Sequence, residues 1–186
     1  MNRLYTIREA NTTDAGAMAK VRVDTWRAAY RGIISDDYLA SLSYENTASQ
    51  WREMILNHLR PGALALVAED AQDGIVGIAV GGPESSGDPI YQAQIYVLYV
   101  LPEHQRRGIG RKLVEAEVHH FLDQRLTTML IWVLADNPWQ AFYEALGGHP
   151  VRKKEEEIGG IRYMEVGYGW DDLGHFGELL PACERT

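Results

Sequence analysis

Residues 91–113 read YQAQIYVLYVLPEHQRRGIGRKL, an apolar run followed by a proline-led polar turn, two adjacent arginines and two closely spaced glycines. The apolar residues at 91–101 fall on both faces of an extended segment, which predicts a central strand covered on both sides. After the turn, helical spacing predicts a helix over 108–124 whose apolar face holds Ile109, Leu113, Val114, Val118, Phe121 and Leu122. The run TTMLIWVLA at 127–135 predicts a second buried strand, so we expect two parallel strands joined by a right-handed crossover.

The segments on either side of this unit add further helices and strands. Their hydrophobic patterns predict strands at 3–9, 63–70 and 74–82 and helices at 12–30 and 45–59. Near the end, two strands flank Gly159 and Gly160, the residues that a tight hairpin turn prefers. The order predicts an α/β fold with a mixed central sheet of about seven strands, flanked by about four helices.

The stretch NPWQAFYEALGG at 137–148 has the start and stop signals of a short helix. Asn137 can cap the helix and Pro138 suits its first position, because proline lacks an N–H that would be unpaired there anyway. Gly147 and Gly148 suit its end. We therefore expect the helix to begin at 138.

Length and composition favour one domain. At 186 residues, of which 46% are hydrophobic, the chain can bury one sizeable core but is short for two ordinary domains. We expect a domain at 1–170 and a tail at 171–186, whose Phe176, Leu179 and Leu180 pack on the domain or on a second subunit in a homodimer.

The sequence shows no signal peptide core and no run of about 18 apolar residues that could span a membrane. A single cysteine, Cys183, cannot form an intrachain disulfide, which suits a reducing compartment. We therefore expect a cytoplasmic protein with no membrane partner. The net charge of -8 disfavours binding to a nucleic-acid backbone and would attract a cationic substrate such as an amine.

The glycine turn at 105–111 has the composition of an anion site. A turn between a strand and a helix directs several backbone N–H groups at one point, beside the positive end of the helix dipole. Gly108 and Gly110 would let a pyrophosphate approach the backbone, and the neighbouring arginines could neutralise its charge. The alternative from the turn alone is that the glycines only shape the chain and the arginines are solvated. Neither the phosphate-loop motif nor the three-glycine dinucleotide motif is present.

In its context, this turn resembles the signature of the GNAT superfamily of acyl-CoA-dependent N-acetyltransferases, a strand followed by [R/Q]-x-x-G-x-[G/A] and a helix. The signature positions are filled by Gln105, Arg106, Arg107, Gly108, Ile109 and Gly110. The stretch NPWQAFYEALGG is similar to the second conserved segment of the family, where an asparagine leads a short helix that carries a tyrosine. The order of elements fits from about residue 3 to 170, so the resemblance makes 1–170 an N-acetyltransferase domain.

The resemblance implies acetyl-CoA as cosubstrate. The family places the pyrophosphate of CoA on the N–H groups of 106–111 and the pantetheine arm along the backbone of the bulged central strand, here Leu98, Tyr99 and Val100. The implied cofactor-binding residues are Leu98, Tyr99, Val100, Gln105, Arg106, Arg107, Gly108, Ile109, Gly110, Arg111, Asn137 and Tyr143. Asn137 either caps its helix, bonds the pantetheine arm or does both.

The resemblance also implies two catalytic groups. Tyr143 matches the tyrosine that protonates the departing thiolate, although it could instead be one more core aromatic. The backbone N–H of Val100 would stabilise the charge on the thioester oxygen. The base is left open, because Gln94 stands where many relatives have a glutamate, and an amide cannot accept a proton at neutral pH. Tyr96 could order a water molecule that carries the proton.

The acceptor pocket of the family lies between the first helices and the final hairpin, where this chain has Trp26, Tyr30, Tyr38 and Tyr44. With Gln94 and Tyr96, Trp26 and Tyr30 are the substrate-site residues we expect, although both also fit a core. Asp36 and Asp37 more simply start a helix than attract an amine. The histidines show no metal-ligand spacing, so no metal is expected.

The sequence therefore predicts transfer of an acetyl group from acetyl-CoA to a primary amine, on a small molecule or a peptide, by direct attack in a ternary complex. The alternative is a non-catalytic acyl-CoA-binding or sensing module of the same fold, which the glutamine at position 94 keeps open.

Overall fold

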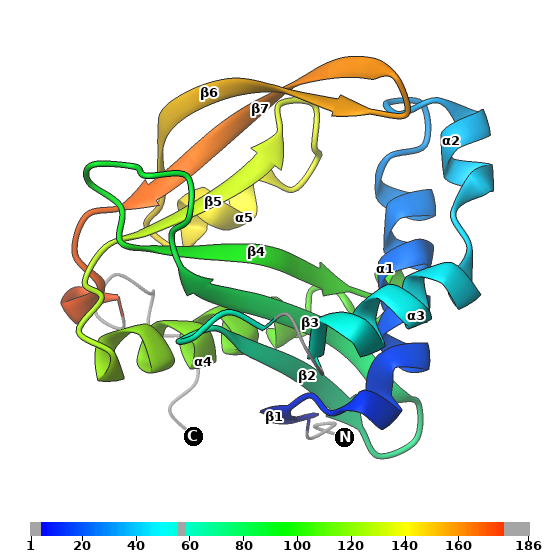
Figure 1. Cartoon of the computed structure of the whole chain (residues 1–186), viewed down its shortest axis with the longest axis horizontal. Helices are drawn as coiled ribbons and strands as arrows, with labels where there is room; N and C mark the ends of the chain where they lie inside the picture. The colour runs from blue at the N-terminus through cyan, green and yellow to red at the C-terminus, as the bar shows by residue number, and fades with distance from the viewer. Residues whose placement is uncertain (1–4, 56–58, 177–186) are drawn as a thin grey trace.

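The computed structural model describes residues 5–55 and 59–176 (Figure 1). In chain order the elements are β1 (Tyr5–Glu9), η1 (Thr12–Asp14), α1 (Ala15–Ala29), α2 (Asp36–Ser41), α3 (Tyr44–Glu53), β2 (Leu64–Asp70), β3 (Gly74–Pro83), β4 (Ala93–Val100), η3 (Pro102–His104), α4 (Ile109–Asp123), β5 (Met129–Leu134), α5 (Gln140–Ala145), β6 (His149–Ile158), β7 (Ile161–Trp170) and η4 (Leu173–His175).

All seven described strands form one sheet in the order β1-β2-β3-β4-β5-β7-β6. Only β4 and β5 pair in parallel, and the other neighbours are antiparallel. Because α4 connects the two parallel strands, the predicted strand–helix–strand unit and the mixed seven-stranded sheet are both confirmed.

Helices cover both faces of the β3–β4 region. Gly77 and Gly81 lie on the face of β3 that α4 covers. A Cβ atom at either position would come too close to side chains of α4, namely Ile109 and Leu113 at Gly77 and Phe121 at Gly81. Their neighbours Val76 and Ile78 point to the other face, where they are fully buried and α1 packs on β3 and β4. The packing of α1 and α4 on opposite faces holds β3 and β4 in place, and β4 is the strand that borders the site described below.

The first helical region differs from the prediction in its subdivision. A capping box at Asn11 and Asp14 starts the 3-10 turn η1, and α1 follows directly. The helix predicted at 45–59 corresponds to α3, which Ser43 caps, and a separate short helix, α2, capped by Ser35, precedes it, because Leu42 between the two is extended. The described residues therefore contain five α-helices, one more than the approximate four expected. As expected, Asp36 begins a helix.

The start predicted for α5 is wrong. Residues 138 and 139 form a turn, and the helix begins at Gln140. Asn137 is not the helix cap, because its Oδ1 accepts a hydrogen bond from the backbone N–H of Trp139 at 2.8 Å, one residue before the helix. The side chain therefore shapes the turn that leads into α5.

The central strand β4 is covered on both faces only in its first part. Ala93 and Ile95 are buried, whereas Val97 to Val100 are half-buried, since they border a cavity. The expectation of a strand covered along its whole length therefore fails where the site begins. In β5, five of the six residues are buried, as predicted.

The last hairpin turns at Gly159 and Gly160, both with positive φ (62° and 80°), as predicted. Its tip lies against α2, because a Cβ at Gly159 would be 2.6 Å from Tyr38 Cδ2 (Figure 1). After β7, Leu173 and Phe176 are buried in the core, while Leu179, Leu180 and Cys183 lie outside the described residues. Within residues 5–55 and 59–176, none of the helices has the length and apolar composition that crossing a bilayer requires.

Candidate functional site

The parallel strands β4 and β5 separate soon after they start. They pair only at Ala93–Met129, Gln94–Leu130 and Ile95–Ile131, and then diverge (Figure 1). At the same place Tyr96 forms a β-bulge, since Val97 pairs with Val80 and Ile95 with Gly81. A cavity of about 1040 Å³ occupies the opening and extends from α1 and the β6–β7 hairpin to the turn before α4.

The register of β4 determines which main-chain groups face this gap. Leu101 donates its N–H to the carbonyl oxygen of Val76 at 2.9 Å. Because bonding pairs alternate along an antiparallel ladder, the main-chain groups of Tyr99 point to β3, and those of Leu98 and Val100 point to the gap. The Val100 carbonyl is engaged by Gln105 Nε2 at 2.9 Å and Thr25 Oγ1 at 3.3 Å. A ligand along β4 would therefore meet the main chain of Leu98 and Val100, and only the side chain of Tyr99.

The turn before α4 has the geometry of an anion site. Arg106 and Gly108 both have positive φ, 61° and 80°, and Gly108 precedes the helix without a side-chain cap. The first N–H groups of α4 are therefore left unbonded by any cap and point out of the helix end. Arg106 and Arg107 are exposed beside them, and Arg107 Nη1 donates to Tyr5 Oη at 3.2 Å.

The other residues of this turn hold it in place. Gln105 binds the end of β4, as described above, and Ile109 is 1% exposed in the core. Gly110 lies against Phe142, because a Cβ there would be 3.2 Å from Phe142 Cζ. Arg111 forms an ion pair with Glu115, one turn further along α4, at 2.8 Å. Of the seven residues predicted for this turn, all but Arg107 line the cavity.

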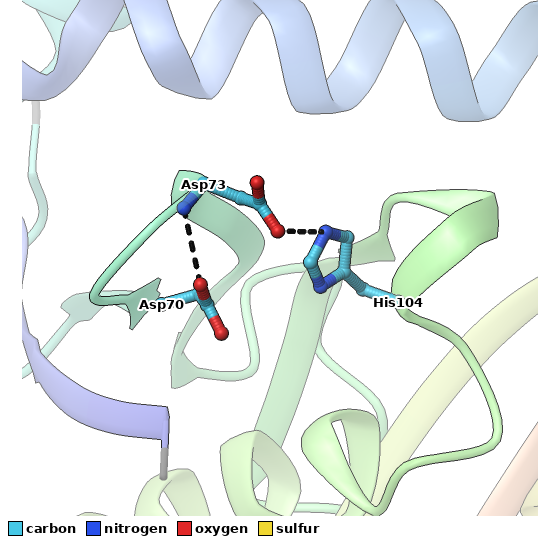
Figure 2. A group of neighbouring side chains, drawn as sticks. All are labelled: Asp70, Asp73 and His104. Carbon is cyan, nitrogen blue, oxygen red and sulfur yellow. Dashed lines mark hydrogen bonds and ion pairs between the residues drawn. The ribbon is translucent and has the colours of Figure 1, made fainter. Parts of the chain in front are cut away.

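A buried histidine connects the turn to the β2–β3 hairpin. His104 is 4% exposed and its Nε2 lies 3.4 Å from Asp73 Oδ2, while Asp70 Oδ1 accepts the backbone N–H of Gln72 and of Asp73 (Figure 2). One ligand atom from each of Asp70, Asp73 and His104 lies within 4.8 Å of the others, a spacing that could hold a metal ion. The sequence did not predict this cluster, because His104 is far in the chain from the two aspartates.

Tyr143 lies between the core and the cavity. It is 8% exposed, stacks on Tyr168 with ring centroids 5.5 Å apart, and meets Phe142 edge-on at 5.3 Å. Its hydroxyl makes no hydrogen bond with the described residues, although it lines the cavity. Burial raises the pKa of Tyr143 above its ordinary value, and the neighbouring hydroxyls of Tyr30 and Tyr99 add to this effect. The hydroxyl is therefore protonated at neutral pH and free to donate.

Asn137 and Tyr30 join the two sides of the cavity. Asn137 Nδ2 donates to Tyr30 Oη at 3.0 Å, in addition to the turn bond to Trp139. Burial raises the pKa of Tyr30, and the nearby Tyr99 hydroxyl also contributes, while the bond from Asn137 opposes the shift. The side-chain oxygen and nitrogen of Asn137 are thus both hydrogen-bonded within the protein.

The acceptor end of the cavity is aromatic. Trp26 meets Tyr30 edge-on at 5.1 Å and lies 6.2 Å from Tyr38, and all three rings line the cavity. Arg22 lies over the Trp26 ring at 5.6 Å. Tyr44 is 44% exposed outside this pocket, where its hydroxyl donates to Asp24 Oδ1 at 2.5 Å. Of the four aromatic residues placed in this region by sequence, three therefore line the cavity.

Gln94 and Tyr96 also line the cavity, as expected. Gln94 pairs with Gly82 and Leu130, in the middle of the three residue pairs that join β4 to β5. The Tyr96 hydroxyl donates to the carbonyl oxygen of Pro83, and burial raises the pKa of Tyr96. A water molecule could therefore bind the Tyr96 oxygen only by donating to it.

One cavity-lining carboxylate, Glu165 on β7, was not predicted. Its side chain is 16% exposed and forms an ion pair with Lys154 of β6 at 3.2 Å. A signal in the sequence is that Glu165 interrupts the otherwise apolar and glycine-rich end of a strand, MEVGYGW. The sequence does not reveal that this strand lies next to β5, on the far side of the gap.

Comparisons with known proteins agree with this geometry. Residues 61–147 match the family model of the acetyltransferase (GNAT) domain. The chain is 37% identical over 177 residues to the uncharacterized N-acetyltransferase YuaI of Bacillus subtilis, an alignment that covers 95% of this chain and 99% of the relative.

Solved structures share the fold. The PaiA N-acetyltransferase of Thermoplasma acidophilum, in complex with coenzyme A, superposes with a TM-score of 0.63 at 20% identity and covers 88% of this chain and 98% of its own. The putative acetyltransferase YncA of Salmonella typhimurium, solved with acetyl-CoA, gives a TM-score of 0.64 at 20% identity, covering 90% and 93%. The chain therefore belongs to the GNAT superfamily and is an acetyl-CoA-dependent N-acetyltransferase.

Proposed function

We propose that this N-acetyltransferase moves the acetyl group of acetyl-CoA to a primary amine, carried by a small molecule or a peptide, by direct attack in a ternary complex. The observation that carries the proposal is that the anion-binding turn and the aromatic acceptor end open into the same cavity. Both reactants can then be bound at once, so no acyl-enzyme is needed. The transferase domain assigned to this reaction spans residues 1–170.

The residues present fit coenzyme A. The uncapped N-terminus of α4, with Arg106 and Gly108 in the left-handed region, suits a pyrophosphate, and the exposed arginines suit its charge. The gap beside β4 offers main-chain groups of Leu98 and Val100 to an extended arm, in the way that a peptide adds to a sheet edge. The turn and the strand end are held together by Gln105.

Acetyl-CoA supplies an activated thioester. In the proposed reaction the N–H of Val100 donates to the thioester oxygen and stabilises the charge that develops there. Tyr143 donates its hydroxyl proton to the departing sulfur, since its hydroxyl has no competing bond among the described residues. Asn137 holds Tyr30 and the turn before α5, and so positions the helix that carries Tyr143.

The acceptor amine would enter between α1 and the β6–β7 hairpin. Trp26, Tyr30 and Tyr38 present ring faces and edges that favour a cation or an apolar chain next to the amine. Gln94 and Tyr96 line the same cavity and would contact the acceptor or the water around it.

A second candidate function is suggested by Gln94, the amide that stands on β4 where a proton-accepting carboxylate would be expected. A protein without a base could bind acyl-CoA as a sensor and not transfer the acyl group. The two functions differ in turnover and not in cofactor binding.

The test is a pair of measurements on the full chain. Coenzyme A should raise the Tm, and thiol release from acetyl-CoA should depend on an added amine in a panel of simple amines, polyamines, aminoglycosides and peptides. Stabilisation by coenzyme A without amine-dependent thiol release from any member of the panel would favour the sensor. Absence of stabilisation would contradict the proposed cofactor site.

A further inference from the structure

Within the described part of the chain, the cavity has three carboxylates in its lining, all on the final hairpin: Glu156, Glu157 and Glu165. Glu156 and Glu157 are exposed, whereas the Glu165 side chain is 16% exposed. Partial burial matters because a carboxylate in bulk water interacts weakly with a bound ammonium group, and one within a cavity interacts more strongly. Glu165 is therefore the carboxylate best placed to act on a bound amine.

The position of Glu165 is fixed by its neighbours on two strands. It pairs with Leu134 of β5 and with Lys154 of β6, and the Lys154 Nζ lies 3.2 Å from its carboxylate. The same Nζ lies 4.5 Å from the centre of the Trp132 ring, which restricts the lysine. Lys154 therefore holds the carboxylate at the side of the cavity that β5 and β7 form.

Glu165 lines the same cavity as Tyr30, which follows α1, and Tyr99 of β4. Burial is the main cause of the raised pKa of Tyr30 and of Tyr99, and the charge of Glu165 contributes to both. The Arg22 charge opposes the shift at Tyr99. The Tyr30 and Tyr99 hydroxyls in turn contribute to the raised pKa of Tyr143. The Tyr30 and Tyr99 hydroxyls thus lie within electrostatic reach of both Glu165 and Tyr143.

The chemistry requires a proton acceptor inside the cavity, and the exposed Glu156 and Glu157 are less shielded from solvent than Glu165. An alkylamine is mostly protonated at pH 7, because its pKa is about 10. The Gln94 amide cannot accept the proton, and the raised pKa values of Tyr30 and Tyr99 keep those hydroxyls protonated. His104, which also borders the cavity, lies at the cofactor turn with its Nε2 against Asp73.

We infer that Glu165 is the catalytic base, which takes the proton of the incoming ammonium directly or through one water molecule. This role rests on the proposed function. The ammonium gives one proton to the Glu165 carboxylate, and its freed electron pair forms the bond to the acyl carbon. The carbon–sulfur bond breaks, and the sulfur receives the proton of Tyr143. As the amide forms, the nitrogen loses its second proton to water, which returns one proton to Tyr143, and after release of the products Glu165 loses its proton to solvent.

The test uses three single variants of the full chain and an amine for which the wild type releases thiol. Glu165→Gln keeps the shape and removes the base, Glu165→Asp keeps a displaced carboxylate, and Glu155→Gln is the matched control. Glu155 lies on the same hairpin, outside the cavity lining, in an exposed ion pair with Arg162.

We expect Glu165→Gln to lower kcat about 100-fold at pH 7 with the KM for acetyl-CoA unchanged, in line with the usual contribution of a general base. The deficit should shrink as the pH approaches the pKa of the amine, because the amine then arrives unprotonated. Glu165→Asp should recover part of the rate, and Glu155→Gln should match the wild type. A Glu165→Gln rate within a factor of three of the wild type, or a deficit that is equal at all pH values, would overturn the assignment.

A second readout does not depend on turnover. Calorimetric titration of the amine into the complex with coenzyme A, in two buffers of different ionisation enthalpy, reports the protons released on binding. The wild type should bind the ammonium with little release, and Glu165→Gln should bind more weakly and release close to one proton. Equal affinity and equal proton release would contradict the role of Glu165. A wild type that releases no thiol with any amine would overturn both the proposed function and this inference, whereas an active wild type with an unaffected Glu165→Gln variant would overturn the inference alone.

Discussion

Asn137 Nδ2 donates a hydrogen bond to Tyr30 Oη at 3.0 Å, which ties the turn after β5 to the end of α1 across the cavity. The same amide accepts from the N–H of Trp139, so one buried side chain satisfies two partners.

We predict that Asn137→Ala lowers the free energy of unfolding by about 1–3 kcal/mol, because it leaves buried polar groups unpaired. Tyr30→Phe removes only the first of the two bonds and should cost less. Urea denaturation of both variants measures the difference. Equal losses would show that the bond to Trp139 contributes nothing.

Tyr143→Phe should lower kcat about 100-fold while the Tm increase caused by coenzyme A stays the same, because the hydroxyl acts on the leaving group and not on binding. Since burial raises the pKa of Tyr143, we expect no loss of activity from its ionisation up to pH 9. The measurement is kcat against pH. The control is Tyr168→Phe, because the Tyr168 hydroxyl is engaged by Gln140 at 2.9 Å. Unchanged turnover in Tyr143→Phe would contradict the acid role.

Gly108→Ala should combine a backbone cost with a loss of cofactor affinity. Gly108 has φ 80°, and no atom lies within 4 Å of the place that the alanine methyl group would take, so the cost in unfolding free energy is the left-handed strain. That strain is worth about 1 kcal/mol. Gly87→Ala is the matched control, with φ 83° and equally open space in a loop far from the turn in the sequence. Both should lose the same stability, and only Gly108→Ala should raise the Kd for coenzyme A. A raised Kd in both variants would point to a global effect.

The buried carboxyl group of Glu117 should make the free energy of unfolding depend on pH. This α4 residue is fully buried, neither carboxylate oxygen has a hydrogen-bond partner among the described residues, and burial raises its pKa to about 8. The folded state therefore binds the proton more tightly than the unfolded state, so stability is full below about pH 4.5 and falls as the pH rises to about 8. At about 1.4 kcal/mol for each pKa unit, the rise from 4.5 to about 8 corresponds to a total on the order of 5 kcal/mol.

Glu117→Gln should remove most of this pH dependence and be the more stable protein at pH 9. Urea denaturation at pH 5, 7 and 9 measures it, with Glu115→Gln on the same helix as the control. Parallel pH profiles for the wild type and Glu117→Gln would contradict the effect.

The sequence predicts those parts of the fold and site that depend on local chemistry. The strand, turn and helix around Gly108 follow from hydrophobic period and turn residues, and the seven residues of the turn lie together because they are adjacent in the chain. The range of α2 was not predicted, and the start of α5 was predicted too early, since the cap at Ser35 and the Asn137 bonds decide them.

Contacts between residues far apart in the sequence were also not predicted. Glu165 reaches the cavity because β7 pairs with β5, and His104 meets Asp73 because the β2–β3 hairpin packs beside the turn. No local pattern contains that information, and β-strand register over long separations is the part of a fold that single-sequence periodicity describes least.

The short parallel ladder between β4 and β5 has a mechanical consequence. Only three residue pairs join the four strands β1–β4 to the three strands β5–β7. The sheet therefore consists of two parts, β1–β4 and β5–β7, joined by this short ladder and by α4. The free energy of local opening should be lowest at the ladder. A ligand that fills the gap between β4 and β5 would contact both parts of the sheet and hold them together. Its binding should slow hydrogen exchange in β5 and the second half of β4 more than in β1 and β2. The two parts of the sheet should then unfold in one cooperative transition.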